Sequence, residues 1–270
     1  MESTPVPTII IDKNKYNVII INKRKMIINS PIVFVSETNS FKPRIVMWVK
    51  ENRNKIILKA SHETKEIYLK FVCICEERKA FLNLIWKYKH GNIIDILGVY
   101  DTNHYSGNNL VSEANYGIAM EYGTPLRSIV EGKKYIRDII CGIKFLHEQG
   151  IVHMDIKPDN VVVVNGIAKI IDFELARTLG KNEHFNSICC TRRYLPESKT
   201  QRGMCYGSDI CCLGYTILEL FTSGYNFDLQ DLLVNENIQH KGFLFKMTCD
   251  DCDMRPSIRE VYNYFNLVSF

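Results

Sequence analysis

Four polar residues that lie close together in the sequence carry groups suited to chemistry: Asp155, Lys157, Asn160 and Asp172. The carboxylate of Asp155 can accept a proton, and the ammonium group of Lys157 can balance negative charge nearby. Asn160 and Asp172 offer hard oxygen atoms, which are the ligands that Mg²⁺ takes in proteins. A base, a cation and magnesium ligands are together the groups that phosphoryl transfer uses.

The order of these residues resembles a known family. The segment His153–Asn160 reads HMDIKPDN, which is similar to the H-R-D-x-K-x-x-N catalytic loop of Ser/Thr protein kinases, and Asp172-Phe173-Glu174 stands where they carry Asp-Phe-Gly. The resemblance implies that Asp155 is the catalytic base and Lys157 its partner. It also implies that Asn160 and Asp172 hold Mg²⁺.

Hydrophobic periodicity predicts the elements that must position these groups. The first 60 residues read as short strands, and apolar residues spaced three to four apart predict one helix from about Glu66 to Lys89. The Asn165-Gly166 turn predicts a hairpin between strands at 161–164 and 167–171. The other expected strands are 8–11, 18–21, 32–35, 45–49, 55–58, 93–100 and 118–121, and the other expected helices are 136–146, 209–221 and 257–267.

This order of elements predicts an α+β, bilobal protein-kinase-like fold with a β-rich N-lobe and a helical C-lobe. We expect an N-terminal extension of unknown role at 1–29, the N-lobe at 30–122 and the C-lobe at 123–270. Met120 and Tyr122 resemble the gatekeeper and hinge between kinase lobes. Further markers in family-like order are Asp209, Gly214, Glu219, Glu197 and Arg255, the last two as an expected ion pair.

The lysine that would contact ATP has two candidates. Lys59, in KIILK, resembles the V-A-I-K strand of kinases, and Lys70, in IYLK, is its competitor. We favour Lys59 because it leaves room for a full helix before His90. Its partner carboxylate would then be Glu77, with Glu76 as a rival, although Phe81 occupies the position that is usual for this glutamate.

Three departures argue against efficient phosphoryl transfer. None of the fifteen glycines lies in the first 90 residues, so the turn near 36–41 lacks the residue that lets backbone N–H groups approach phosphates. Glu174 replaces the glycine after Asp172-Phe173 and brings a second carboxylate close to Asp172. Met154 replaces the arginine that pairs with a phosphorylated activation segment.

The Phe-Glu-Leu run at 173–175, together with similar segments at 29–32, 118–122, 194–196 and 255–261, resembles the mixed lineage kinase domain-like family, whose cellular member is the pseudokinase executioner of necroptosis. About 30 strand-like residues before the kinase-like region cannot form that family's four-helix killing bundle. The resemblance is therefore to the form carried by poxviruses, which has the pseudokinase domain alone.

This resemblance implies a viral decoy in the host cytoplasm. It would bind the host receptor-interacting serine/threonine kinase of necroptosis and block activation of the cellular executioner. By analogy the contact surfaces are 66–89 and 174–197, with Phe81, Glu174, Ser187 and Thr191 as candidate partner-binding residues. The candidate phosphoacceptors are Thr178, Ser187 and Thr191. For each of them the alternative is a solvated loop hydroxyl that is not phosphorylated.

The alternative is an active Ser/Thr protein kinase with an atypical, glycine-free phosphate loop, so enzyme activity stays open at this point. We expect no required cofactor, with Mg²⁺–ATP as the alternative. The net charge of +4 gives no nucleic-acid signal, and no apolar run is long enough to span a bilayer. Cys249 and Cys252 form a C-x-x-C pair without a second well-spaced ligand pair, so the sequence does not predict a zinc site.

Overall fold

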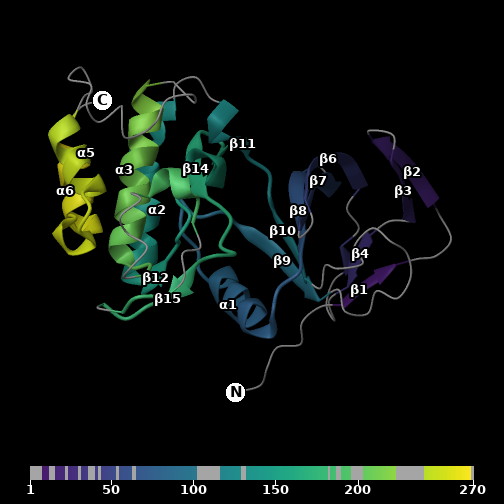
Figure 1. Cartoon of the computed structure of the whole chain (residues 1–270). Coiled ribbons are helices and arrows are strands. Elements are labelled where there is room, and N and C mark those ends of the chain that lie inside the picture. The colour runs from purple at the N-terminus through teal and green to yellow at the C-terminus, as the bar shows by residue number, and fades with distance from the viewer. Residues whose placement is uncertain are drawn as a thin grey trace. The chain divides into compact units, whose positions relative to one another are not determined.

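The computed structural model describes residues 8–11, 16–21, 24–29, 32–35, 40–41, 44–52, 55–62, 65–101, 116–128, 132–181, 183–186, 190–195, 203–222 and 240–268. The chain divides into two compact units. Unit 1 comprises Met1–Tyr88 and Asp95–Tyr122, and unit 2 comprises Lys89–Ile94 and Gly123–Phe270. Most strands of unit 1 and the α-helices of unit 2 are labelled in Figure 1.

Unit 1 is built on an eight-stranded sheet with the order β5-β4-β1-β9-β10-β8-β7-β6. All neighbouring strands pair antiparallel except β1 and β9. A separate hairpin joins β2 to β3, and the helix α1 follows β8. The elements are β1 (Thr8–Ile11), β2 (Tyr16–Ile21), β3 (Arg24–Asn29), β4 (Ile32–Val35), β5 (Ser40–Phe41), β6 (Arg44–Asn52), β7 (Lys55–His62), β8 (Lys65–Val72), α1 (Glu76–Trp86), β9 (Ile96–Asp101) and β10 (Tyr116–Glu121).

The helix predicted from Glu66 to Lys89 is wrong in its first part. Residues 65–72 form strand β8, which pairs with β7 on one side and β10 on the other, and helix α1 begins only at Glu76. Leu69–Val72 are buried in an unbroken run because this central strand is covered on both faces. Such a run lacks the alternation typical of strands, so its apolar spacing can be read as helical.

Unit 2 is mainly helical. Its helices are α2 (Ile136–Glu148), α3 (Tyr206–Thr222), α5 (Lys241–Thr248) and α6 (Ile258–Leu267), with short 3₁₀ turns η1 (Leu126–Ser128), η2 (Gly132–Tyr135), η3 (Pro158–Asn160), η4 (Arg192–Tyr194) and η6 (Cys252–Met254). Helices α2, α3 and α6 lie where three helices were predicted, whereas α5 was not predicted. The strands β11 (Thr124–Pro125), β13 (Val161–Val164) and β14 (Ile167–Ile170) form one small sheet. A second pairs β12 (Ile151–Val152) with β15 (Arg177–Thr178).

The predicted turn at Asn165-Gly166 is confirmed by its backbone angles. Asn165 and Gly166 both take positive φ, at 50° and 80°, as the tight turn of the β13–β14 hairpin requires. Gly150 has φ of 75° just after α2, where a left-handed residue ends a helix.

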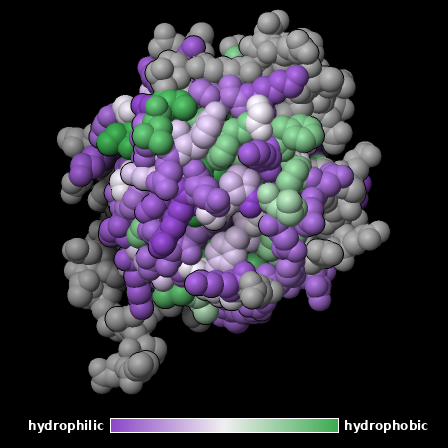
Figure 2. Space-filling model, turned by 90° about the vertical axis from the view of Figure 1, so that its left-hand side faces the viewer, coloured by the Kyte–Doolittle hydropathy of each residue, from purple (hydrophilic) through white to green (hydrophobic). Residues whose placement is uncertain are grey.

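Helix α3 forms the centre of unit 2. Every residue from Ser208 to Leu220 is buried, as expected of a helix that is apolar all round. The face that carries α5 and α6 is mainly hydrophilic, with small separate hydrophobic areas (Figure 2). Among the described residues, no helix combines the length and the apolar character needed to cross a membrane.

Helix α6 begins with a capping box, which the sequence signals as Ser257-x-x-Glu260. The Ser257 hydroxyl accepts a hydrogen bond from the Glu260 N–H at 3.4 Å, and the Glu260 carboxylate accepts one from the Ser257 N–H at 2.7 Å. We expect Ser257→Ala to lower the free energy of unfolding by about 1 kcal/mol, measured by urea denaturation. Asn263→Ala, an exposed change within the same helix, should cost less than that. Equal losses in the two variants would contradict a specific role for the cap.

Candidate functional site

His153 shapes the loop that carries Asp155. Its Nε2 donates to the Ile171 carbonyl at 3.0 Å, and its Nδ1 accepts from the Asp155 N–H at 3.3 Å. The ring is fully buried and meets the edge of the Phe173 ring, with centroids 5.3 Å apart. These contacts fix both the tautomer of the imidazole and the position of the loop beside the end of β14.

Asp155 lies at the centre of a local hydrogen-bond network. One carboxylate oxygen accepts from Lys157 Nζ at 2.5 Å and from Asn160 Nδ2 at 2.9 Å. The other accepts from the hydroxyl of Thr191 at 2.7 Å and from its N–H at 3.1 Å. Burial raises the pKa of Asp155, but the hydrogen bonds from Lys157 and Thr191 outweigh it and leave the pKa below its usual value. The group is therefore a carboxylate at neutral pH.

Thr191 has a role in this network that the sequence analysis did not assign to it. Its hydroxyl accepts from Lys157 Nζ at 2.6 Å while donating to Asp155, so the three side chains form a closed set. Thr191 is half-buried there. No local pattern could have predicted this contact, because 36 residues separate Thr191 from Asp155. Only comparison with the same position in related kinases could have indicated it.

Asn160 and Asp172, the two predicted magnesium ligands, lie on neighbouring segments. The Ile171 N–H donates to the Asn160 carbonyl at 2.9 Å, which ties the end of β14 to the catalytic loop. Asn160 is buried and uses its Nδ2 toward Asp155, while Asp172 takes a left-handed backbone with φ of 67°. An amide oxygen and a carboxylate on adjoining segments are the donor set that suits Mg²⁺, so these residues would hold the ion.

Asp209, in the first turn of α3, binds the backbone of the catalytic loop through its carboxylate. Its carboxylate is fully buried and accepts hydrogen bonds from the N–H groups of His153 and Met154, both at 2.8 Å. The ring of His147 lies 3.0 Å from the same carboxylate. The predicted family marker at Asp209 thus has a physical task, which is to satisfy the backbone where Met154 takes φ of 68°.

Met154 is buried in an apolar cluster rather than exposed toward a phosphate. The cluster consists of Val152, Met154, Leu179 and Met204. Leu175, Phe185, Cys190, Leu195 and Tyr206 pack against it. Several of these residues belong to the segment after Asp172, so apolar packing holds that segment to the catalytic loop.

The end of the same segment is held to α3 by a polar group. The Tyr194 hydroxyl donates to Glu219 at 2.6 Å, and Arg127 contacts both side chains. Burial and the bond to Glu219 raise the pKa of Tyr194. Arg255, expected to pair with Glu197, donates to the carbonyls of Cys249, Gly207 and Asp250. Glu197 and Ser187 lie outside the described residues.

The prediction that Lys59 occupies the strand leading into the helix is wrong. Lys59 lies on β7, where its Nζ is 2.6 Å from Glu66 and 4.1 Å from the centroid of the Tyr122 ring. Lys70 lies on β8, the strand that runs directly into α1, and is buried with 5% of its surface exposed. Lys59 was favoured to leave room for a helix from residue 66, and that helix does not exist.

Met120 and Tyr122, the predicted gatekeeper and hinge, lie at the end of β10. Met120 is buried, and the ring of Tyr122 lies 4.8 Å from that of Tyr68. Burial, followed by the nearby Tyr122 hydroxyl, raises the pKa of Tyr68 to about 12. Tyr122 is thus packed against β8 and β7 of its own unit.

Helix α1 places its acidic residues on the surface. Glu76 and Glu77 lie in the first turn and are exposed, and Glu76 pairs with Lys79 at 2.7 Å. Phe81 is half-buried, with the Arg78 guanidinium 5.0 Å from its ring centroid. The buried positions of the helix are Arg78, Lys79, Leu82 and Ile85.

The remaining predicted residues are placed only in part. Glu174 is half-buried, and Thr178 is exposed at the end of β15. The glycine-free turn expected to cover phosphates lies outside the described residues at 36–39, while Ser40 and Phe41 form β5.

A sheet-based unit followed by a helical unit that carries an Asp-Lys-Asn loop defines a kinase-like domain. The protein kinase domain family model matches residues 46–265, and the chain belongs to this family.

Protein kinases are among the relatives with similar sequences. Serine/threonine-protein kinase ssp1 of Schizosaccharomyces pombe is 27% identical over 223 residues, covering 69% of this chain and 34% of the relative. The probable serine/threonine-protein kinase fhkE of Dictyostelium discoideum is 29% identical over 184 residues, covering 61% of this chain and 25% of the relative. MAP3K epsilon protein kinase 1 of Arabidopsis thaliana is 31% identical over 157 residues, covering 52% of this chain and 11% of the relative. The chain thus spans about a third or less of the length of these relatives.

Proposed function

We propose that this member of the protein kinase domain family is a pseudokinase that acts by binding another kinase. The observation that carries the proposal is the distribution of charge on α1. Kinases need an ion pair between the strand lysine and a glutamate of this helix. The helix offers only Glu76 and Glu77 as acids, both exposed, while its buried positions include Arg78 and Lys79.

A cationic helix interior works against assembly of the nucleotide site. Lys70 is the buried lysine on the preceding strand, and a carboxylate facing it would stabilise its charge. The buried face of α1 instead carries Arg78 and Lys79, and Glu76, one of its two acids, pairs with Lys79 at 2.7 Å. On this proposal, the exposed acids of α1 align a nucleotide less well than the buried lysine–glutamate pair of an active kinase.

The contacts of Met154 support a domain whose segment after Asp172 is not switched by phosphate. An arginine at this position would leave that segment dependent on a phosphate for its charge partner. Met154 instead packs with Val152, Leu179 and Met204, and apolar packing needs no modification. Such a domain presents a fixed surface to a partner, which suits a binding role.

The partner follows from the resemblance to the mixed lineage kinase domain-like family. We take it to be the receptor-interacting serine/threonine kinase of necroptosis in the cytoplasm of an infected host. The chain would occupy that kinase as a viral decoy and so block its signal. The binding surface would include α1, where Leu84 is 40% exposed and Trp86 is 36% exposed.

An active Ser/Thr kinase is the second candidate. The observation in its favour is the assembled network of Asp155, Lys157, Asn160 and Thr191, which holds a carboxylate ready as a base.

Two measurements on the purified chain test the proposal. Transfer of labelled phosphate to a general Ser/Thr substrate should be no greater for the wild-type chain than for Asp155→Asn. The immobilised chain should capture the receptor-interacting kinase from stimulated cells, and Leu84→Asp should weaken that capture about tenfold or more. Phe245→Asp, an exposed apolar-to-acidic change on α5, is the matched control and should leave capture unchanged. Phosphate incorporation that disappears in Asp155→Asn would support the active kinase instead, and failure to capture the kinase would refute the partner.

A further inference from the structure

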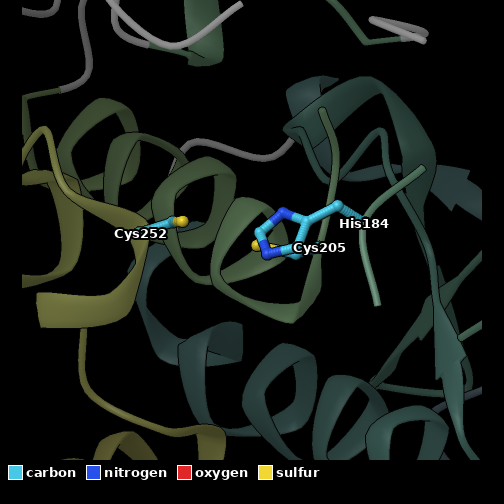
Figure 3. A group of neighbouring side chains, drawn as sticks. All are labelled: His184, Cys205 and Cys252. Atoms are coloured by element: carbon cyan, nitrogen blue, oxygen red, sulfur yellow. The ribbon is translucent and has the colours of Figure 1, made fainter. Parts of the chain in front are cut away.

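Three potential metal ligands from distant parts of unit 2 meet beside the start of α3. They are His184, Cys205 and Cys252, and one ligand atom from each lies within 4.8 Å of the other two. Figure 3 shows the sulfur atom of Cys252 directed toward the imidazole ring of His184, with the sulfur atom of Cys205 beside that ring. Cys205 is buried and the other two are half-buried. From the sequence, Cys252 was considered only with Cys249, because 21 and 47 residues separate His184, Cys205 and Cys252.

The backbone holds His184 and Cys205 opposite each other. Phe185 and Met204 form an isolated antiparallel bridge, with both N–H···O bonds at 2.8 Å. Continuing that register by one residue places His184 across from Cys205, where side chains of an antiparallel pair are close neighbours. The arrangement therefore rests on backbone hydrogen bonds rather than on chance side-chain rotamers.

Cys252 is brought to the same place by a second close backbone approach. A Cβ on Gly207 would lie 2.8 Å from the Cys252 carbonyl oxygen and 3.3 Å from its Cβ, so the glycine permits the contact. Arg255 secures the loop by donating to the Gly207 carbonyl at 2.7 Å and to the Cys249 carbonyl at 3.0 Å. The cysteine thus faces the first turn of α3 from a fixed loop.

The imidazole of His184 supplies an independent sign that a ligand belongs here. Its Nδ1 is buried, and among the described residues it has no hydrogen-bond partner. Buried polar atoms are nearly always satisfied, and a bound ion or water is a common partner for those that lack one in the protein. The surrounding groups suit a cation: the Ser208 hydroxyl lies 3.9 Å from Cys205 Sγ and can donate to it, and a carboxylate oxygen of Asp253 lies 3.7 Å from Cys252 Sγ.

We infer that His184, Cys205 and Cys252 bind a zinc ion. Zn²⁺ favours thiolate and imidazole ligands at about 2.3 and 2.0 Å in a tetrahedron, which places the ligand atoms about 3.5–3.8 Å apart. The observed limit of 4.8 Å allows this after small side-chain rotations. Both cysteines would bind as thiolates, and their protons would pass to solvent. The positive end of α3, just after Cys205, favours such a negative ligand. The carboxylate of Asp253 or a water molecule would complete the tetrahedron.

Such an ion would link three separate segments of the unit. His184 lies between β15 and the bridge at Phe185, Cys205 directly precedes α3, and Cys252 opens η6. Zinc would therefore fix the middle of the segment after Asp172 against the helical core. This inference does not rest on the proposed pseudokinase role, because an active kinase would gain the same link.

Metal binding by the full chain tests the inference. The chain is purified under reducing conditions, freed of metal with a chelator and titrated with Zn²⁺, with stoichiometry measured by elemental analysis. We expect one zinc per chain and a higher melting temperature when zinc is present. Co²⁺ in its place should give the thiolate-to-cobalt charge-transfer band and the intense visible bands of a tetrahedral site. The absence of stoichiometric zinc or of these bands would overturn the inference.

Variants locate the site. His184→Gln and Cys252→Ser should each weaken zinc binding at least about 100-fold. Loss of a residue that only hydrogen-bonds to a metal ligand already lowers metal affinity by up to about 100-fold, and loss of a ligand itself should lower it at least as much. Cys141→Ser, which alters a half-buried cysteine on α2 outside the cluster, is the matched control and should bind zinc as the wild type does. Circular dichroism of the metal-free proteins shows whether each variant folds. Cobalt bands that persist in the His184→Gln, Cys252→Ser double variant would refute the site. The site would also be refuted if Cys205 and Cys252 formed a disulfide and the chain bound no zinc once that disulfide had been reduced.

Discussion

Asp209→Asn should lower the free energy of unfolding by about 3–5 kcal/mol, a large share of the stability of a domain. The carboxylate is fully buried and accepts from two backbone N–H groups, at His153 and Met154, with the His147 ring 3.0 Å away. The asparagine side chain has only one acceptor oxygen, so its NH₂ group would face one of the N–H donors that the carboxylate now accepts from. Each buried donor left unsatisfied costs about 1–3 kcal/mol. Urea denaturation should show a lower midpoint with an unchanged slope.

Asp138→Asn is the matched control for this prediction. Asp138, on α2, is half-buried, and its one hydrogen bond within the described part of the chain comes from the Ala168 N–H at 2.8 Å. The amide oxygen of asparagine can keep that one bond, so we expect a loss of about 1 kcal/mol or less. A difference of less than about 1 kcal/mol between the two variants would show that Asp209 does not hold the catalytic loop in the way its contacts indicate.

Gly203→Ala should destabilise the protein by about 3–4 kcal/mol, through two separate effects. Gly203 has φ of 79°, and the left-handed conformation costs a residue with a Cβ about 1–2 kcal/mol. The added Cβ would also lie 2.3 Å from the Phe185 carbonyl oxygen, which no side chain can tolerate. Phe185 would have to move, and its two hydrogen bonds to Met204 would be lost at about 1 kcal/mol each.

Gly166→Ala separates the two effects. Gly166 has nearly the same backbone angle, with φ of 80°, but a Cβ there meets nothing within 4 Å. Its substitution should therefore cost only the conformational part, about 1–2 kcal/mol, in the same denaturation measurement. If Gly166→Ala proved as costly as Gly203→Ala, the close approach of Phe185 would contribute nothing.

Local patterns were sufficient to predict much of unit 2. The Asn165-Gly166 turn and the apolar helix α3 both lie where the sequence places them. In each case the signal comes from neighbours in the chain: residues that tolerate positive φ, or an apolar run long enough for a buried helix. The catalytic loop belongs to the same class, because Asp155, Lys157 and Asn160 lie within six residues.

Unit 1 shows where local patterns mislead. The helix predicted from Glu66 begins in the central strand Lys65–Val72, which was misread because burial on both faces removes the alternation that marks a strand. That error carried into the choice of Lys59 over Lys70, since the choice rested on the length of the expected helix. Only pairing with β7 and β10, which lie elsewhere in the chain, decides which lysine occupies the strand before α1.

The sequence by itself determined the family and the chemical groups of the catalytic loop, because residue types at short spacing carry that information. Tertiary structure alone decided which groups meet across long separations. Thr191 reaches Asp155 from 36 residues away, and Asp209 reaches the loop from more than 50. His184 and Cys205 face each other through a bridge between two segments, and Cys252 joins them where a glycine admits its backbone. Such contacts depend on how the chain packs as a whole, and no local pattern encodes them.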